Sequence, residues 1–163
     1  MKRFLGILIG VCMMVLAVGC GEEIVKEQSA TYVFTQVEAD MYTMTDTQTL
    51  DAKGDIVYQL QETTTLEFAA LDDTTLNLLV SYYDETVAAM KENAPEGVEV
   101  ASSYEGNIYT MEIKLDLETA DIQSLVAGGY LMGLNEEKPE NFTFISFDQT
   151  CAGLEASGYT LKK

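Results

Sequence analysis

The sequence predicts an α+β domain, in which an antiparallel sheet of about five or six strands has two or three helices packed on one face. Three observations lead to this fold class. Two stretches, 56–68 and 108–117, alternate apolar and polar residues with the period of a half-buried strand. Between them, the apolar residues of 74–92 recur with the period of an α-helix. A serine-initiated capping box then begins a further helix near position 146.

The first two strands are predicted at 31–37 and 41–50. Both stretches are rich in threonine and aromatic residues, which suit a strand because branched or bulky side chains pack well on a pleated surface. In the second strand Tyr42 and Met44 share one face and the threonines share the other. The polar segment 51–55 then predicts a turn.

The third strand, 56–68, has the clearest alternation in the chain. Its apolar face is formed by Ile56, Tyr58, Leu60, Leu66 and Phe68. Its polar face is formed by Gln59, Gln61, Thr63, Thr65 and Glu67. Glu62 and Thr64 fall on the apolar face, and we expect them at a margin of the sheet where they reach water. The sheet is therefore expected to bury one face and expose the other.

The best helix of the sequence is predicted over 74–92, with an Asp-Asp pair before it as the N-cap. Its apolar stripe is about 100° wide, which suits a helix lying on a sheet. The stripe is formed by Leu76, Leu79, Val80, Tyr83, Val87 and Met90. Leu78 and Tyr82 lie off this stripe. We expect the C-terminal helix or the loop before it to cover them, and the alternative is an exposed patch.

A second hairpin is predicted over 98–117, with its turn at 105–107. In its longer strand the odd-numbered residues from Tyr109 to Leu117 are apolar and share one face. A short helix follows at 121–126, and two consecutive glycines stop it. This hairpin is expected to extend the same sheet.

The stretch 130–134 is apolar and glycine-rich, and a charged loop at 135–140 follows it. Periodicity cannot assign so short a run. We favour a cap over the core, and the alternative is an exposed binding loop. The last helix is predicted from the capping box at Ser146 to Ser157, with a short edge strand after it.

The N-terminus has the three parts of a bacterial lipoprotein signal. A Lys-Arg pair is followed by about fifteen apolar residues, fewer than the roughly twenty that span a bilayer. The run LAVGC then ends at Cys20 and resembles a lipobox. Residues 1–19 are therefore predicted to be a lipoprotein signal peptide, 20–30 an acylated cysteine with its tether, and 31–163 a single α+β domain. The alternative is an ordinary cleaved signal with an incidental cysteine.

Lipidation defines the expected location and one partner. A diacylglycerol on the Cys20 thiol carries two acyl chains, such as palmitate, and each buried CH2 contributes about 0.8 kcal/mol, so two chains give stable anchoring. The expected location is the extracytoplasmic face of the cell membrane. The domain is expected to be a monomer, with an envelope protein or a small ligand as its further partner.

The charge of the chain excludes one class of partner. Lys2 and Arg3 leave with the signal peptide, so the mature chain has seven lysines, no arginine and 27 acidic residues, which gives a net charge of about −20. Nucleic acid is excluded because phosphate contacts need clusters of Lys or Arg. The acidic surface is also repelled by anionic lipid headgroups. It is expected to keep the domain soluble, and a cationic partner is the alternative reason for it.

The residue types present exclude most catalytic chemistry. The chain has no histidine, which removes Ser-His-Asp and Cys-His catalysis and most zinc sites. Cys12 leaves with the signal peptide and Cys20 is acylated, so Cys151 has no disulfide partner. Cys151 lies on the apolar face of the last helix, where we expect an inert thiol. No catalytic residue, metal site or cofactor is predicted.

Two stretches carry a resemblance to a known family. They are YEGNIYTMEIKLDLETADIQSL at 104–125 and ISFDQTCAGLEASGYTLKK at 145–163, in addition to the lipobox. With these motifs the chain resembles the YehR-like family of small bacterial lipoproteins, a family of unknown function. The resemblance implies an α+β fold whose antiparallel sheet is covered on one face by helices. It implies no catalytic residues.

The leading functional hypothesis is a membrane-anchored, non-catalytic module that binds a ligand or a protein partner. One alternative is a weak Ca2+-binding domain, since an oxygen-rich surface suits Ca2+. A less favoured alternative is a carboxylate-based hydrolase. As binding residues we name Leu78, Tyr82, Tyr130 and Met132, which would form an amphipathic groove on the helix side. The polar outer face of the sheet is the alternative binding surface.

Overall fold

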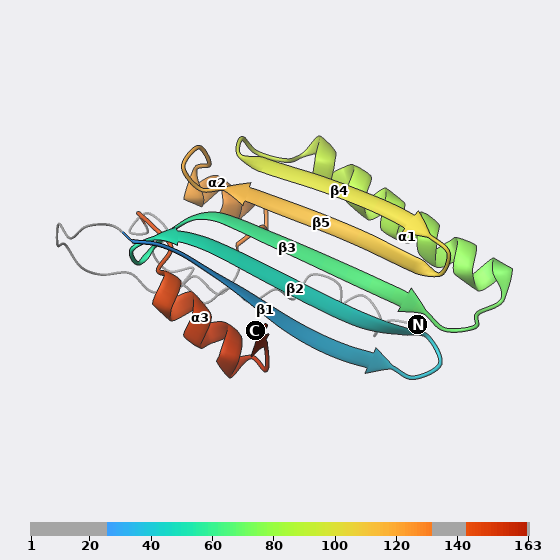
Figure 1. The fold of residues 1–163 in the computed structure, drawn as a ribbon. Helices are drawn as coiled ribbons and strands as arrows, with labels where there is room; N and C mark the ends of the chain where they lie inside the picture. Colours follow the sequence, from blue (N-terminus) through green and yellow to red (C-terminus); the bar gives the residue numbers. More distant parts are fainter. Residues whose placement is uncertain (1–25, 132–142, 163) are drawn as a thin grey trace.

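The computed structural model describes residues 26–131 and 143–162. In this part of the chain six strands form one antiparallel sheet in the order β4-β5-β3-β2-β1-β6, and three helices pack against it (Figure 1). The strands are β1 Glu27–Glu38, β2 Tyr42–Lys53, β3 Ile56–Phe68, β4 Val98–Glu105, β5 Ile108–Asp116 and β6 Thr160–Leu161. The helices are α1 Asp73–Glu92, α2 Ile122–Ala127 and α3 Phe147–Ala156. The predicted α+β fold class is confirmed.

The first three strands form an antiparallel meander that is longer than predicted. β1 begins at Glu27 because residues 27–30 pair with the end of β2, so the last part of the predicted tether belongs to the sheet. β2 likewise continues to Lys53, and the predicted turn contracts to 54–55. A turn this tight is accessible because Gly54 adopts φ = 61°, a left-handed conformation that suits glycine.

A β-bulge near the start of β3 changes which side chains face the core. The pairing of β2 with β3 shifts between Asp51 and Ala52, so that Ala52 pairs with Val57 instead of Tyr58. Val57 is therefore buried, whereas Ile56 is 51% exposed. The prediction that Ile56 and Tyr58 lie on the apolar face is wrong, because an extra residue in one strand inverts the alternation beyond it.

All three helices lie on one face of the sheet, and two apolar clusters fill the space between. One cluster joins the end of the sheet at the β2–β3 turn to α2 and α3, and it includes Leu60 and Leu154. The other joins the opposite end of the sheet to α1, and it includes Leu66 and Tyr83. Leu60 and Leu66 are six residues apart on β3 and therefore share a face. Figure 1 shows the result, with α1 along β4 and α3 on the β1 side.

α1 begins and packs as predicted, except at two positions. Its N-cap is Asp72, whose carboxylate accepts hydrogen bonds from the backbone N–H of Thr74 (3.0 Å) and Thr75 (3.1 Å). Leu78 is 68% exposed and Tyr82 is 43% exposed. The expectation that the C-terminal helix covers them is wrong, because α3 packs in the other apolar cluster, away from α1. Most of the loop before that helix lies outside the described residues, so cover by the loop stays a prediction.

The second hairpin and α2 follow the predictions. β4 and β5 join through a tight turn in which Gly106 has φ = 62°. The N-cap of α2 is Asp121, whose carboxylate accepts from a backbone N–H of the first turn at 2.9 Å. Of the stretch 130–134, Tyr130 is half-buried and Leu131 is buried in the cluster of α2 and α3. The remainder of that stretch lies outside the described residues.

α3 begins with half of the predicted capping box. The Ser146 hydroxyl oxygen accepts from the Gln149 N–H at 3.3 Å, but the Gln149 side-chain Oε1 is buried without a partner. The Ser146 hydroxyl instead donates to Asp55 in the β2–β3 turn at 2.8 Å. Asp55 also accepts from the Asp148 N–H at 2.8 Å. The start of α3 is therefore held against the β2–β3 turn, 91 residues earlier in the chain.

Candidate functional site

The residues of the predicted helix-side site do not all lie together. Leu78 and Tyr82 are one turn apart on the exposed side of α1, in its first half. Tyr130 lies near the end of α1, where its hydroxyl donates to the Met90 carbonyl at 2.9 Å. Eight residues separate Tyr82 from Met90, an axial rise of about 12 Å. Met132 is outside the described residues, so the four-residue site stays a prediction.

The outer face of the sheet, meaning the face without helices, is an ordered polar surface. The Gln61 side-chain amide donates to the Glu112 carboxylate between β3 and β5 on this face. One row of hydroxyl side chains crosses five strands: Thr35, Thr45, Thr65, Thr110 and Ser103. The face offers many hydrogen-bonding groups, so any ligand here is held by polar contacts and not in an apolar pocket.

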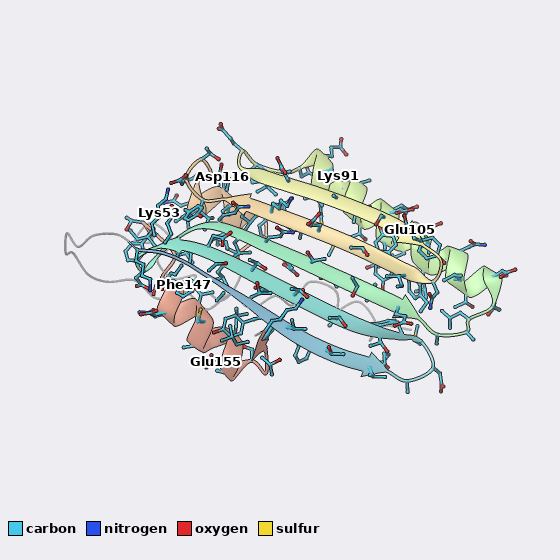
Figure 2. The ribbon with its side chains drawn as sticks, viewed as in Figure 1. Lys53, Lys91, Glu105, Asp116, Phe147 and Glu155 are labelled. Carbon is cyan, nitrogen blue, oxygen red and sulfur yellow. The ribbon has the colours of Figure 1, made fainter. Side chains whose placement is uncertain are left out.

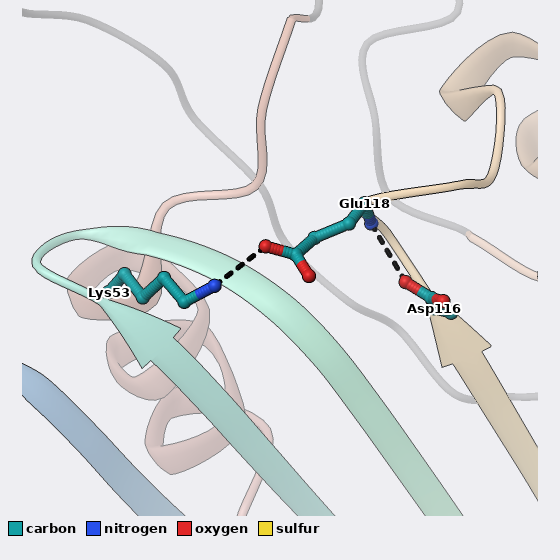
Figure 3. A network of polar contacts seen from close by, with 3 residues as sticks. All are labelled: Lys53, Asp116 and Glu118. Atoms are coloured by element: carbon teal, nitrogen blue, oxygen red, sulfur yellow. Dashed lines mark hydrogen bonds and ion pairs between the residues drawn. The ribbon is translucent and has the colours of Figure 1, made fainter.

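An ion pair lies at the end of the outer face nearest the β2–β3 turn. Lys53 Nζ is 2.7 Å from Glu118 Oε1, and the Glu118 N–H donates to Asp116 Oδ1 at 3.0 Å (Figure 3). The same ammonium group lies 4.6 Å above the centre of the Tyr58 ring. Both members of the ion pair are solvent-exposed, so water and salt screen it. It connects the end of β2 to the segment that follows β5.

A hollow of about 490 Å3 lies where β4 begins, and we call it the acidic hollow. Its walls come from the α1–β4 loop, the start of β4 and the end of β5. Its charged lining consists of three carboxylates, Glu96, Glu99 and Asp116, and one ammonium group, Lys114. Because carboxylates outnumber the ammonium group, the hollow suits a cationic side chain better than an anionic one.

A cluster of polar side chains lies in the middle of the covered face, between the two apolar clusters. It consists of Asp46 and Gln48 on β2, Glu62 and Thr64 on β3, and Tyr159 before β6. The Thr64 hydroxyl lies 3.2 Å from Asp46 Oδ1 and 3.4 Å from Glu62 Oε1. Tyr159 donates to Asp46 Oδ2 at 2.5 Å. The expectation that Glu62 and Thr64 lie at a margin of the sheet is wrong, because β3 is an interior strand and both side chains are buried.

Burial sets the protonation of this polar cluster. Desolvation, with repulsion from Asp46, raises the pKa of Glu62 to about 8. Burial also raises the pKa of Asp46, but three side-chain hydrogen bonds favour its charged form, whereas Glu62 has only the long contact to Thr64. The proton of the pair therefore resides on Glu62 at neutral pH. Gln48 pairs with Glu62 across the strands and has a buried Oε1 without a partner, so a protonated carboxyl is the better neighbour for it.

Cys151 lies half-buried on α3 against the neighbouring apolar cluster. Burial raises the pKa of its thiol, which lowers the fraction of reactive thiolate. We expect a maleimide at pH 7 to label Cys151 in the folded protein about tenfold more slowly than a free thiol in a short peptide. Labelling in urea is the control and should restore the peptide rate. Equal rates in the folded and unfolded protein would show that the folded domain leaves the Cys151 thiol accessible, and would contradict this expectation.

The arrangement defines a class of protein: a single antiparallel sheet with helices on one face and an open, acidic face and edge. Two solved structures share this fold. The NMR structure of the E. coli YehR protein aligns with a TM-score of 0.56 at 20% identity, over 85% of this chain and 93% of that chain. The NMR structure of a protein from Streptococcus pneumoniae TIGR4 aligns with a TM-score of 0.55 at 16% identity, over 90% and 92%. No protein-family model and no curated protein matches the chain.

The chain therefore has the fold of the YehR protein, as the resemblance to the YehR-like family implies. These two structural similarities establish the fold, but they assign no role to any residue of this chain. The polar cluster and the acidic hollow were not predicted from the sequence. The signal for the cluster was present, because Asp46 and Gln48 share a face of β2 with Tyr42 and Leu50 and so had to be buried with them.

Proposed function

We propose that the chain is a membrane-anchored lipoprotein on the extracytoplasmic face of the membrane, and that its domain is a non-catalytic module that binds a ligand or a protein partner. The one-sided sheet is the observation that carries the binding role. Helices cover one face, whereas over residues 26–131 and 143–162 the outer face has no helix and no strand pairs with the far side of β4. Surfaces of this kind bind through hydrogen bonds, charge and strand pairing.

The entry of the chain into the sheet supports an anchor at one end of the domain. The Lys26 carbonyl accepts from the Gly54 N–H at 2.9 Å, so β1 starts beside the β2–β3 turn. Cys20 precedes Lys26 by six residues, which span at most about 20 Å. Anchored there, the domain turns the end with Lys53 toward the membrane and the end with Glu105 away from it (Figure 2). Among the described helices, none is long and apolar enough to cross a membrane.

The anchor is tested by replacing Cys20. We expect Cys20→Ala to move the protein from the detergent phase to the aqueous phase on Triton X-114 partitioning, because two acyl chains are lost. Cys151→Ala is the matched control, since it removes the other thiol of the mature chain and should stay in the detergent phase. Intact-mass measurement of the membrane-extracted wild type should show the diacylglycerol. A wild type without lipid mass would show that the cleaved-signal alternative is correct.

A weak Ca2+ site is the second candidate. The buried polar cluster supplies carboxylate, hydroxyl and amide oxygens, which are ligands that Ca2+ accepts. It has only two acidic residues, and no group of three or more histidine, cysteine or acidic residues in the described part of the chain is placed to hold a metal ion. Isothermal titration with Ca2+ separates the candidates, because saturable heat that Glu62→Gln abolishes would favour the cation-binding function.

A further inference from the structure

We propose that the edge of β4, together with the acidic hollow at its start, binds an extended basic segment of a partner protein by adding that segment to the sheet as a further strand. The partner segment is defined by its chemistry: an unpaired strand with Arg or Lys side chains about six residues apart on one face. This proposal rests on the domain being a binding module, and it does not depend on the lipid anchor.

β4 is an edge strand without the usual protection. It is the last strand of the sheet on its side, and alternate residues along its eight-residue length turn their N–H and C=O groups away from β5. Its sequence, VEVASSYE, contains neither proline nor lysine, and its pairing with β5 has no bulge. The opposite edge differs, because β6 pairs with Tyr32 and Val33 in the middle of β1.

The side chains of β4 leave its backbone approachable. The centre of the strand carries only small residues, Ala101, Ser102 and Ser103. Ala101 and Ser103 are exposed, and Ser102 is half-buried on the helix side. α1 runs beside β4 on the covered face of the sheet (Figure 1). An incoming strand can therefore reach the edge without displacing a large side chain.

Charge along β4 defines the kind of segment that fits. Glu99 and Glu105 are both exposed and lie on the outer face of β4, six residues apart, a span of about 20 Å. Glu99 borders the acidic hollow, where Glu96 and Asp116 add two further carboxylates. A basic side chain opposite Glu99 can extend into this hollow, and a second basic side chain six residues away lies opposite Glu105. Opposite charges across neighbouring strands stabilise the pair.

A second copy of the chain is a poor occupant of the same edge. Antiparallel pairing of two β4 strands about Ser102 places Glu99 of each copy opposite Glu105 of the other. Like charges directly opposite one another destabilise strand pairing. The net charge of about −20 on each mature chain adds long-range repulsion. A cationic partner removes both costs.

The test uses the detergent-solubilised full-length protein and a fluorescent peptide, Arg-Thr-Val-Thr-Val-Thr-Arg, with blocked ends. Its sequence reads the same in both directions, so it presents the same side chains in a parallel or an antiparallel pairing. We expect saturable binding that weakens as salt is raised, because the ion pairs are solvent-exposed. The peptide with Glu in place of both Arg residues should not bind. Amide chemical-shift changes should be confined to β4, β5 and the loop before β4.

Backbone methylation tests strand addition separately from charge. In one peptide the N–H groups of the odd residues are methylated, and in a second those of the even residues. Toward one neighbouring strand, an antiparallel β-strand donates hydrogen bonds from every second residue only. Methylation of one set of N–H groups should therefore abolish binding, and methylation of the other set should leave the affinity within about twofold. Equal binding of the two peptides would contradict strand addition, and shifts on another face would place the site elsewhere.

Charge-matched variants complete the test. Glu99→Gln with Glu105→Gln should weaken binding by roughly fivefold, since the double substitution removes both ion pairs with the peptide. Glu38→Gln with Glu67→Gln removes the same charge from β1 and β3 and is the control. Equal weakening by both pairs would show non-specific attraction and overturn the proposal. A wild type without lipid mass would overturn the anchor and leave this binding result unaffected, so the two failures are distinguishable.

Discussion

Glu62→Gln is expected to stabilise the protein at pH 8 by about 4 kcal/mol and to leave its stability at pH 4.5 nearly unchanged. The pKa of the Glu62 carboxyl is about 8 in the folded protein and 4.5 in the ordinary exposed group. Glutamine has the shape of the protonated acid and no charge to bury. It also brings amide donors to the buried cluster, where Gln48 Oε1 has no partner.

The sign of this effect follows from proton binding. Above pH 4.5 the unfolded chain releases the Glu62 proton, whereas the folded chain keeps it until about pH 8. The stability that the wild type has below pH 4.5 is therefore lost as pH rises to 8, by about 1.4 kcal/mol per pH unit. The glutamine variant has no such group, so the gap between the two proteins should widen over this range.

Urea unfolding at pH 4.5, 6, 7 and 8 measures the gap. Glu67→Gln is the matched control, because Glu67 lies on the same strand but is exposed on the outer face. The same chemical change there should give a curve parallel to that of the wild type. If the free energy of unfolding of Glu62→Gln also changed with pH in parallel with that of the wild type, the assignment of the shared proton to Glu62 would be wrong.

Gly97→Ala is expected to destabilise the fold by about 3 kcal/mol. Gly97 has φ = 81°, which costs an L-residue roughly 1 to 2 kcal/mol. A Cβ at this position would also lie 2.8 Å from the Asp116 carbonyl oxygen and 2.9 Å from the Ala120 backbone N. These neighbours are backbone atoms, so the start of β4 has to move, at a further cost of about 1 to 3 kcal/mol.

Gly106→Ala separates the two contributions. Gly106 also has a positive φ, of 62°, but a Cβ there meets no atom within 4 Å. We expect this variant to lose only the conformational part, about 1 kcal/mol in urea unfolding at pH 7. Equal losses for Gly97→Ala and Gly106→Ala would show that the close approach of Gly97 to the end of β5 has no energetic consequence.

The elements that could be predicted from the sequence are those whose signals are local. The Asp72 N-cap, the apolar stripe of α1 and the Ser146 cap all depend on residues within one or two turns of one another, and all three are present in the structure. The alternation of β5 is also local, and its odd-numbered face packs on the helices as expected. The pairing within each hairpin, β2 with β3 and β4 with β5, is local for the same reason, because its strands are neighbours in the chain.

The candidate site was predicted less well, for a physical reason. Leu78 and Tyr82 were singled out because they lie off the apolar stripe, and whether another element covers such residues depends on where α3 packs. Whether β4 or another strand forms the edge depends on how the two hairpins join, through β3 and β5. Both the cover over Leu78 and Tyr82 and the position of β4 at the edge depend on contacts between distant segments, so a pattern within one segment cannot predict them.

By itself, the sequence determined the α+β class, the acidic character of the domain and the absence of histidine chemistry. Composition and the periodicity within one segment do not depend on how distant segments pack. Only the tertiary structure decided that Glu62 is buried, because the strands on both sides of β3 come from segments before and after it in the chain. Only pairing between strands decided that Val57 and not Tyr58 faces the core, because a bulge is a mismatch between two strands and not a property of either one.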